Sequence, residues 1–261
     1  MRTSVIGATG VLGRYVVPML LALGHEVYAL VRNSQNSGLP IHGRLTLFQA
    51  NILDLSSLHA GVAGCDAVLH LATAIPKPGT AVDWERNTAI RTAGTSNLLK
   101  VAAQAGARRY IQQSIALVYE SAGDAWVTET SATAPPTPIT APVRNMEAQV
   151  MASQLEWLIL RGGIFYGPGT GRMFDWNKLA LEGRLTVPGD GGDYLSLVHV
   201  EDMASAVVAA VDVSARSAIV NVVDDEPITI DGKRDLPRGP IDVVLHGFGG
   251  HALRRIAHVS L

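Results

Sequence analysis

The chain has 261 residues, a net charge of −2 and only 5% aromatic residues, so it offers neither a basic surface nor stacking platforms for nucleic acid. Its single cysteine, Cys65, excludes an internal disulfide framework and is typical of a reducing cytosol. A strand pattern begins at once and no run approaches the ~20 apolar residues of a membrane helix, so we expect a cytoplasmic protein with neither signal peptide nor membrane partner.

Strands and helices alternate along the chain, as a parallel sheet with crossover helices requires. Strands are predicted at residues 3–6, 26–31, 45–49, 67–71, 109–113, 157–161 and 218–222. Helices are predicted at residues 11–23, 55–62, 82–105, 144–154 and 200–211. The pattern predicts a doubly wound α/β fold of the Rossmann type. Residues 1–165 would form the dinucleotide-binding domain and 166–261 a small substrate lobe, with 200–223 returning to the Rossmann core.

The first predicted strand is followed by a turn with three spaced glycines, Gly7, Gly10 and Gly13, and then by an apolar helix. Such a turn lets the backbone approach a pyrophosphate, and the free N–H groups at the helix start stabilise its negative charge. A glycine motif alone is a weak signal, but one placed between a strand and a helix is strong. The turn predicts a dinucleotide site; a glycine-rich turn without a ligand is the plainer alternative.

The end of the second predicted strand indicates which dinucleotide is bound. An acid at this point binds a free ribose 2′-hydroxyl, whereas an arginine accommodates a 2′-phosphate. Arg32 stands there with no acid beside it, and Arg14 could add a second positive charge. The sequence therefore favours NADP(H) over NAD(H), although both arginines could also be solvated loop charges.

Further segments match one family in order and spacing. They are 50–54 after the third strand, His70 to Thr73 closing the fourth, Asn87 with 94–99 in the long helix, 113–119 around Ser114, 160–169 with Tyr166-Gly167-Pro168, 198–202 and 220–227. With the glycine turn they make the chain resemble the extended short-chain dehydrogenase/reductases, the NAD(P)-dependent epimerase/dehydratase family, over residues 1 to about 226.

The resemblance implies a set of cofactor-binding residues. Asn51 and Asp54 would lie near the adenine, Ala72 and Thr73 near a ribose, and Tyr166 and Pro168 on the nicotinamide side. The full expected set is Gly7, Thr9, Gly10, Val11, Leu12, Gly13, Arg32, Asn51, Asp54, Ala72, Thr73 and Asn87. Plainer roles exist as well: Asp54 could be a helix N-terminal acid, and His199 and Asp202 could fix the start of a helix.

The chain lacks the tyrosine and lysine, four residues apart, on which the resembling family's chemistry rests. No tyrosine has a lysine at position +4, and if Glu147 marks the motif, the two positions hold Ile139 and Val143. A register shifted by one residue pairs Thr140 with Arg144, which could bind an anion or orient a carbonyl. The usual proton relay is therefore missing.

Three hydroxyls remain as candidate catalytic groups: Ser114 to bind a substrate oxygen, and Tyr119 or Tyr166 to donate a proton, with water as the alternative donor. Each could instead have a structural role. Histidines and acids show no metal-ligand spacing, and no nucleophile motif occurs. Beyond Ile230 the chain is rich in Arg, Gly, Pro and His, and it departs from the amphipathic helix expected in the substrate lobe.

We expect an NADP(H)-dependent oxidoreductase acting on a small carbonyl or alcohol. Its partner would be a small-molecule substrate, and a homodimer is one option for its assembly. Two alternatives remain open: a nucleotide-sugar epimerase or dehydratase, and a non-catalytic NADP(H)-binding redox sensor.

Overall fold

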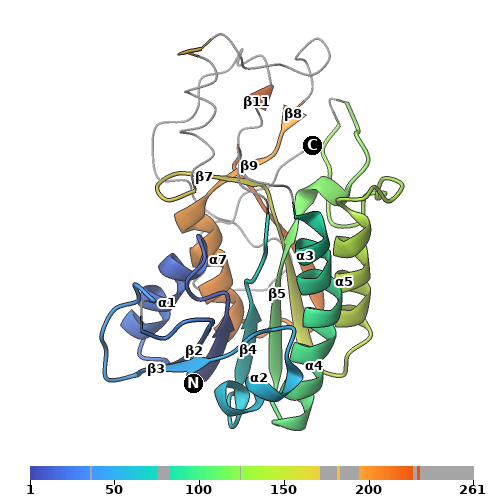
Figure 1. Cartoon of the computed structure of the whole chain (residues 1–261). Coiled ribbons are helices and arrows are strands. Elements are labelled where there is room, and N and C mark those ends of the chain that lie inside the picture. Colours follow the sequence, from blue (N-terminus) through green and yellow to red (C-terminus); the bar gives the residue numbers. More distant parts are fainter. Residues whose placement is uncertain are drawn as a thin grey trace.

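The computed structural model describes residues 1–35, 37–75, 83–123, 125–170, 181–182, 194–225 and 228–229. Its centre is a seven-stranded, all-parallel sheet of order β10-β6-β5-β4-β1-β2-β3 (Figure 1). The strands are β1 (Arg2–Ile6), β2 (Glu26–Val31), β3 (Leu45–Gln49), β4 (Ala67–His70), β5 (Arg109–Ile115), β6 (Glu156–Gly162) and β10 (Ala218–Val222). The doubly wound α/β fold predicted from the sequence is confirmed.

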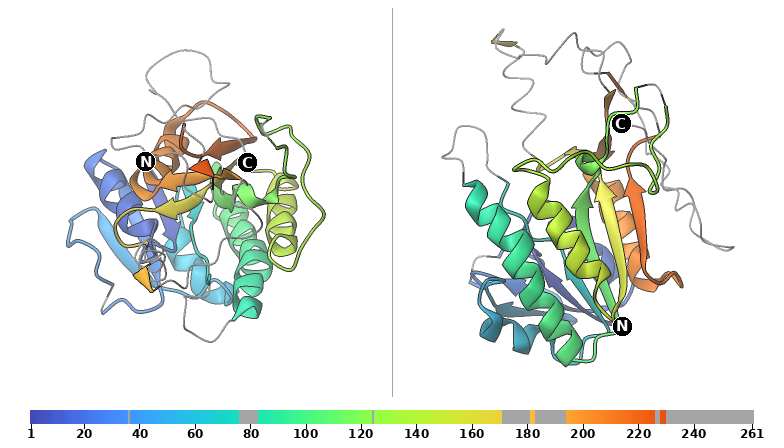
Figure 2. Two further views of the ribbon diagram at one scale, coloured as in Figure 1. Left: turned by 90° about the horizontal axis from the view of Figure 1, so that it is seen from above. Right: turned by 90° about the vertical axis from the view of Figure 1, so that its right-hand side faces the viewer.

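Helices cover both faces of the sheet (Figure 2). One face packs against α1 (Gly13–Ala22) and α7 (Val200–Asp212), and the other against α2 (Leu55–Val62), α4 (Thr95–Gln104) and α5 (Ala141–Met151). Because side chains alternate along a strand, Val5 of β1 joins the first core and the next residue, Ile6, joins the second. Burial on both faces explains why these strands read as apolar runs.

The long helix predicted at 82–105 is interrupted. The structure has α3 (Trp84–Ala89), a π-helical turn at Ile90–Gly94, and then α4. The turn inserts an extra residue into the helical ladder, and the side chain of Gln149 from α5 donates to the Thr92 carbonyl at 3.3 Å. Arg91, within this turn, is thereby buried against α5.

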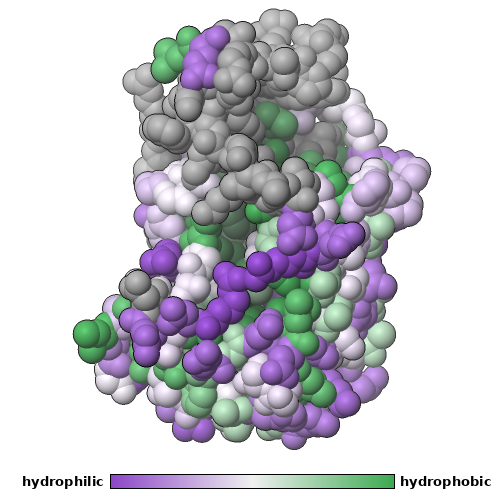
Figure 3. All heavy atoms as spheres, in the orientation of Figure 1, coloured by the Kyte–Doolittle hydropathy of each residue, from purple (hydrophilic) through white to green (hydrophobic). Residues whose placement is uncertain are grey.

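Short strands that the sequence pattern did not indicate lie beyond the carboxyl edge of the sheet, in the upper half of Figure 1. β7 (Ile164–Tyr166) pairs in parallel with β9 (Leu197–His199), and β8 (Tyr194–Leu195) pairs antiparallel with β11 (Ile228–Thr229). The atypical C-terminal sequence beyond Ile230 lies outside the described residues. None of the described helices is long and apolar enough to cross a membrane. The face of the molecule shown in Figure 3 carries a band of hydrophilic residues with apolar side chains around it.

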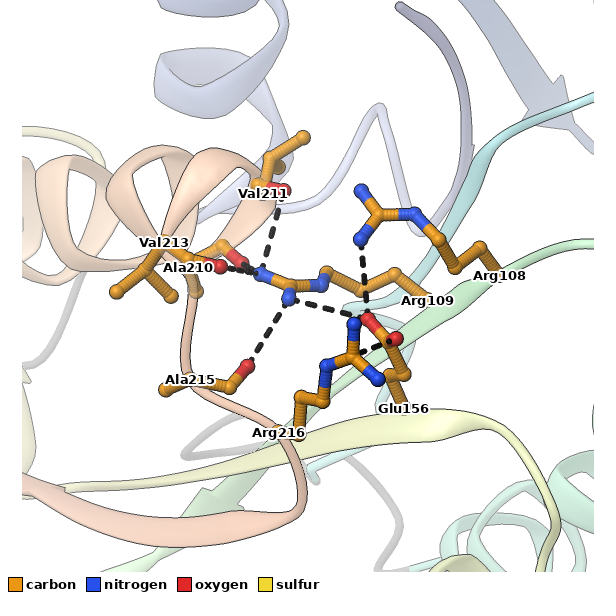
Figure 4. A network of polar contacts seen from close by, with 8 residues as sticks. All are labelled: Arg108, Arg109, Glu156, Ala210, Val211, Val213, Ala215 and Arg216. Carbon is orange, nitrogen blue, oxygen red and sulfur yellow. Dashed lines mark hydrogen bonds and ion pairs between the residues drawn. The ribbon is translucent and has the colours of Figure 1, made fainter.

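A buried guanidinium ties the amino end of β5 to the last turn of α7 (Figure 4). Arg109 is 1% exposed and donates to the carbonyls of Ala210 at 2.8 Å and Ala215 at 2.9 Å, with further bonds to Val211 and Val213. A helix leaves its last carbonyls without partners, so this side chain replaces the missing intrahelical donors. Arg108, Arg109 and Arg216 all contact Glu156 on β6.

Candidate active site

The glycine turn between β1 and α1 has the geometry of a close backbone cradle. Gly7 has φ +89°, and a Cβ there would lie 2.6 Å from the backbone nitrogen of Ala72. A Cβ at Gly13 would collide with the Gly7 carbonyl oxygen, whereas one at Gly10 would meet only that same oxygen, at 3.1 Å. Gly7 and Gly13 are therefore required for packing, and Gly10 is the least crowded of the three, with a single close contact.

The two arginines near the turn differ in their surroundings. Arg32, which directly follows β2, is exposed and has no hydrogen bond or ion pair with any other described residue. Arg14 donates from Nε to the Thr9 carbonyl at 3.0 Å, and its terminal nitrogens reach the carbonyls of Ser37 and Gly38. Arg14 therefore links the glycine turn to the loop after β2, and Arg32 is the free cation.

The other predicted cofactor residues follow the strands at the carboxyl edge. Asn51 accepts from the Leu53 N–H, and Asp54 caps α2 by accepting from the Ser56 N–H at 3.0 Å. Ala72 and Thr73 lie one residue beyond the end of β4, and Asn87 Oδ1 accepts from the Ala74 N–H at 3.1 Å. Asp54 thus has the structural role that the sequence allowed as an alternative. Asn87 fixes the backbone that leaves β4.

Ser114 is fully buried near the end of β5. Its hydroxyl donates to Glu147 Oε1 at 2.6 Å, and Arg161 of β6 binds both oxygens of that carboxylate, from Nε at 3.0 Å and Nη2 at 2.7 Å. Sequence reasoning used Glu147 only as a marker and missed this ion pair. The signal was the charged Arg161 inside an apolar strand, because a buried charge requires a partner. The Ser114 hydrogen is committed to Glu147.

Tyr119 is also buried and committed. Its hydroxyl donates to Asn221 Oδ1 at 2.7 Å, and the Arg161 guanidinium lies 4.8 Å from its ring centre. Burial is the main cause that raises the pKa of Tyr119. This phenol therefore holds the segment after β5 against β10.

Ile139 and Val143, which occupy the positions expected for the tyrosine and lysine, differ in their exposure to solvent. Ile139 is 45% exposed just before α5, and Val143 within α5 is fully buried. The shifted pair does not come together either. Thr140 Oγ1 lies 3.0 Å from Thr137 Oγ1, and the Arg144 guanidinium donates to Thr133. The Thr140 and Arg144 side chains therefore bind other residues and not each other.

Tyr166, at the end of β7, is only half-buried, and the loop that follows it is bonded to α1. The carbonyl of Pro168, two residues further on, accepts from the Tyr15 hydroxyl of α1 at 2.9 Å. The Tyr166 phenol interacts with Asp224, a carboxyl that is 2% exposed. Burial and the negative charge of this partner raise the pKa of Tyr166. Sequence reasoning missed Asp224, which follows directly on the β10 run.

His199 and Asp202 occupy the helix start where the sequence placed them. His199 caps α7 by accepting from the Glu201 N–H at Nδ1, and its ring meets Tyr166 edge to face with centroids 5.2 Å apart. Among the described residues, no three histidine, cysteine or acidic side chains are grouped to hold a metal ion.

Comparison with known proteins places the chain in a well-populated group. The model of the NAD dependent epimerase/dehydratase family matches residues 3–222. A 3-diazoavenalumate denitrifying reductase from a Streptomyces species is 36% identical over 87% of this chain and 77% of its own length. Cinnamoyl-CoA reductase 1 of Petunia hybrida is 34% identical over 44% of this chain and 35% of its own.

Solved structures of the same group share the fold. The dTDP-glucose 4,6-dehydratase DesIV from Streptomyces venezuelae, solved with NAD bound, superposes with a TM-score of 0.77 at 25% identity. This superposition covers 88% of this chain and 78% of DesIV.

Proposed function

The chain belongs to the NAD-dependent epimerase/dehydratase family, and from that membership we propose that it is an NADP(H)-dependent oxidoreductase acting on a small carbonyl or alcohol. The observation that carries the cofactor choice is Arg32, an exposed guanidinium at the end of β2 with no acid beside it and no partner among the described residues. A 2′-phosphate is the group such a side chain binds well, through charge-assisted hydrogen bonds.

The residues of the turn fit a dinucleotide. Gly10 is the least crowded of the three glycines. Among the described residues, the N–H groups of Val11, Leu12 and Gly13 bind no backbone acceptor, whereas the next N–H groups of α1 donate to the Gly10 and Leu12 carbonyls. The N–H groups without a backbone acceptor would hold the pyrophosphate, and Arg32 the 2′-phosphate. When bound, the cofactor supplies the hydride; the protein binds, orients and handles the proton.

Among the three candidate hydroxyls, Tyr166 is the best-supported proton donor. Ser114 and Tyr119 are buried and donate to Glu147 and Asn221, so a substrate oxygen would have to compete with a charged or geometrically fixed acceptor. Tyr166 is partly exposed on the nicotinamide side that the family resemblance implies. In this proposal its phenol donates to the carbonyl oxygen as the carbonyl carbon receives hydride.

A second candidate function follows from the missing relay together with the 36% identical reductase. Replacing a diazonium group by hydrogen needs only hydride, because R–N2+ and H− give R–H and N2 with no proton to deliver. A site with Ile139 and Val143 in the relay positions is compatible with that chemistry. A diazo compound is therefore the acceptor class to test beside carbonyls.

The experiment is a turnover assay that separates these functions. NADPH and NADH oxidation are followed with aldehydes, ketones, keto sugars and an aryl diazonium salt, and products are identified by mass spectrometry. Carbonyl reduction with NADPH supports the first proposal, and N2 release supports the second. Conversion of a nucleotide sugar without net cofactor oxidation would point to an epimerase or dehydratase. Tight NADPH binding with every acceptor inert would point to a redox sensor. The control is Gly10→Val: any turnover that it retains does not depend on a dinucleotide bound at the glycine turn.

A further inference from the structure

Asp224, which interacts with Tyr166, lies where β7, β9 and the end of β10 meet. Asp224 follows β10, and its N–H donates to the Leu197 carbonyl of β9 at 2.7 Å. Its carboxyl interacts with the backbone of His199 and with the Tyr166 phenol of β7. One carboxyl oxygen, Oδ1, is buried and has no partner among the described residues. A carboxylate normally accepts at both oxygens, so a buried carboxyl with one bare oxygen is suited to carrying a proton.

Burial and the charge of Asp202 favour the protonated form of Asp224, whereas Tyr166 and His199 favour the ionised form. From α7, Asp202 faces it with a like charge, and the His199 ring and Tyr166 phenol lie on the other side. Asp202 itself has a raised pKa, caused first by burial and opposed by His199, with Glu201 adding a like charge. Burial is the main cause that raises the pKa of Asp224 to about 6, with Asp202 adding to it.

We propose that Asp224 is a positioning residue that determines whether the Tyr166 phenol can donate to the substrate. This inference rests on the proposed carbonyl reduction. When Asp224 is ionised, it accepts the Tyr166 proton and the phenol is turned inward. When Asp224 is protonated, its O–H donates to the Tyr166 oxygen, and the phenol hydrogen is free to point toward the substrate.

The proton then passes along two bonds. As hydride from the nicotinamide adds to the carbonyl carbon, the Tyr166 O–H bond breaks and its proton goes to the carbonyl oxygen. The Asp224 O–H bond breaks and its proton goes to the Tyr166 oxygen, so the product is the neutral alcohol and the phenol is restored. The Asp224 carboxylate takes its next proton from solvent. The buried acid thus stands in for the lysine as the support of the tyrosine.

The sign of the pH effect follows from the raised pKa. The competent, protonated form of Asp224 is complete below its pKa and is lost as pH rises through about 6. Wild-type kcat should therefore fall about tenfold per pH unit above that point, as a single titrating group dictates. Asp224→Asn can neither titrate nor pass a proton to the Tyr166 oxygen, so its kcat should lie below that of wild type at low pH and should be flat across the same range.

The experiment compares pH–rate profiles of wild type, Asp224→Asn, Tyr166→Phe and the matched control Asp225→Asn, the neighbouring exposed carboxyl. Tyr166→Phe should lower kcat about 100-fold below pH 6, and this deficit should shrink as the pH rises and wild type loses its own donor, with little change in KM for NADPH. Asp225→Asn should keep the wild-type profile. A break near pH 6 that persists in Asp224→Asn, or full activity in Tyr166→Phe, overturns the gating while leaving the reductase assignment intact.

A readout independent of turnover covers variants that fold poorly. The carboxyl 13C resonance of Asp224 in wild-type protein, assigned by its loss in Asp224→Asn, should titrate with a midpoint near 6 that moves in Tyr166→Phe. A midpoint near 4 overturns the inference. If no acceptor is reduced at any pH, the proposed function fails together with the gating, a result distinct from turnover with an unchanged profile.

Discussion

Replacing Arg109 with methionine tests whether the buried guanidinium holds α7 to the sheet. Methionine keeps an apolar stem of similar reach but removes the donors to Ala210, Val213 and Ala215. Leaving a buried acceptor without its donor costs about 1–2 kcal/mol, so three close bonds amount to about 3–6 kcal/mol. At about 2–4 °C per kcal/mol for a chain of this size, Tm should fall by about 10 °C.

The assay is a thermal melt of cofactor-free protein followed by circular dichroism, with Arg108→Met as the matched control. Arg108 also contacts Glu156, at 3.0 Å, but its side chain is 53% exposed, and such a surface ion pair contributes less than about 1 kcal/mol. The control should shift Tm by less than about 3 °C. An Arg109→Met protein that melts within that same interval, or an Arg108→Met protein that is equally damaged, would refute the reasoning.

Three further outcomes are expected. Arg32→Asp should weaken NADPH binding by about 2–4 kcal/mol and leave NADH binding nearly unchanged; equal losses for both cofactors in fluorescence titrations would contradict the 2′-phosphate role. Gly10→Val should abolish dinucleotide binding in calorimetry with a nearly unchanged melt, whereas Gly13→Val should fail to fold, because a Cβ would lie 3.1 Å from the Gly7 oxygen at Gly10 but would collide with it at Gly13. Ser114→Ala should lower stability by about 1–3 kcal/mol in denaturant titrations and change kcat less than threefold, because its hydroxyl serves Glu147. A 100-fold loss of kcat there would return Ser114 to the substrate.

The sheet was predictable because its strands are buried on both faces and read as apolar runs. Strands 26–31, 45–49 and 218–222 have the predicted bounds, and the others differ by one or two residues at an end. The interruption of the long helix was not predictable, because the apolar spacing continues through Ile90–Gly94. The hydrogen bond from Gln149 to the Thr92 carbonyl, which accompanies the π-helical turn, comes from another helix and leaves no local signal in the sequence. Strands β7 and β9 have three residues each, too few for a periodic pattern.

The candidate site divides in the same way. The glycine turn and Arg32 are local features, so their positions follow from the order of strand, turn and helix. The partners of Ser114 and Tyr166 are not local: Glu147 and Asp224 reach them only through the packing of other elements. A hydroxyl in a sequence shows that a donor exists, but not which acceptor it serves, and that is why three candidates could not be ranked before the structure.

Strand β5 has consequences for how this protein can change. Arg109 is its first residue and Ser114 its sixth, so the anchor of α7 and the network at the carboxyl edge stand about 16 Å apart at the rise of a strand. Among the described residues they share no hydrogen-bond partner, and energetic effects at that separation are normally independent. Substitutions at the amino end of β5 can therefore change the stability of the protein without changing the groups at the carboxyl end of the strand. Substitutions that alter the reaction at one end can be tolerated, or rescued, by adjustments at the other.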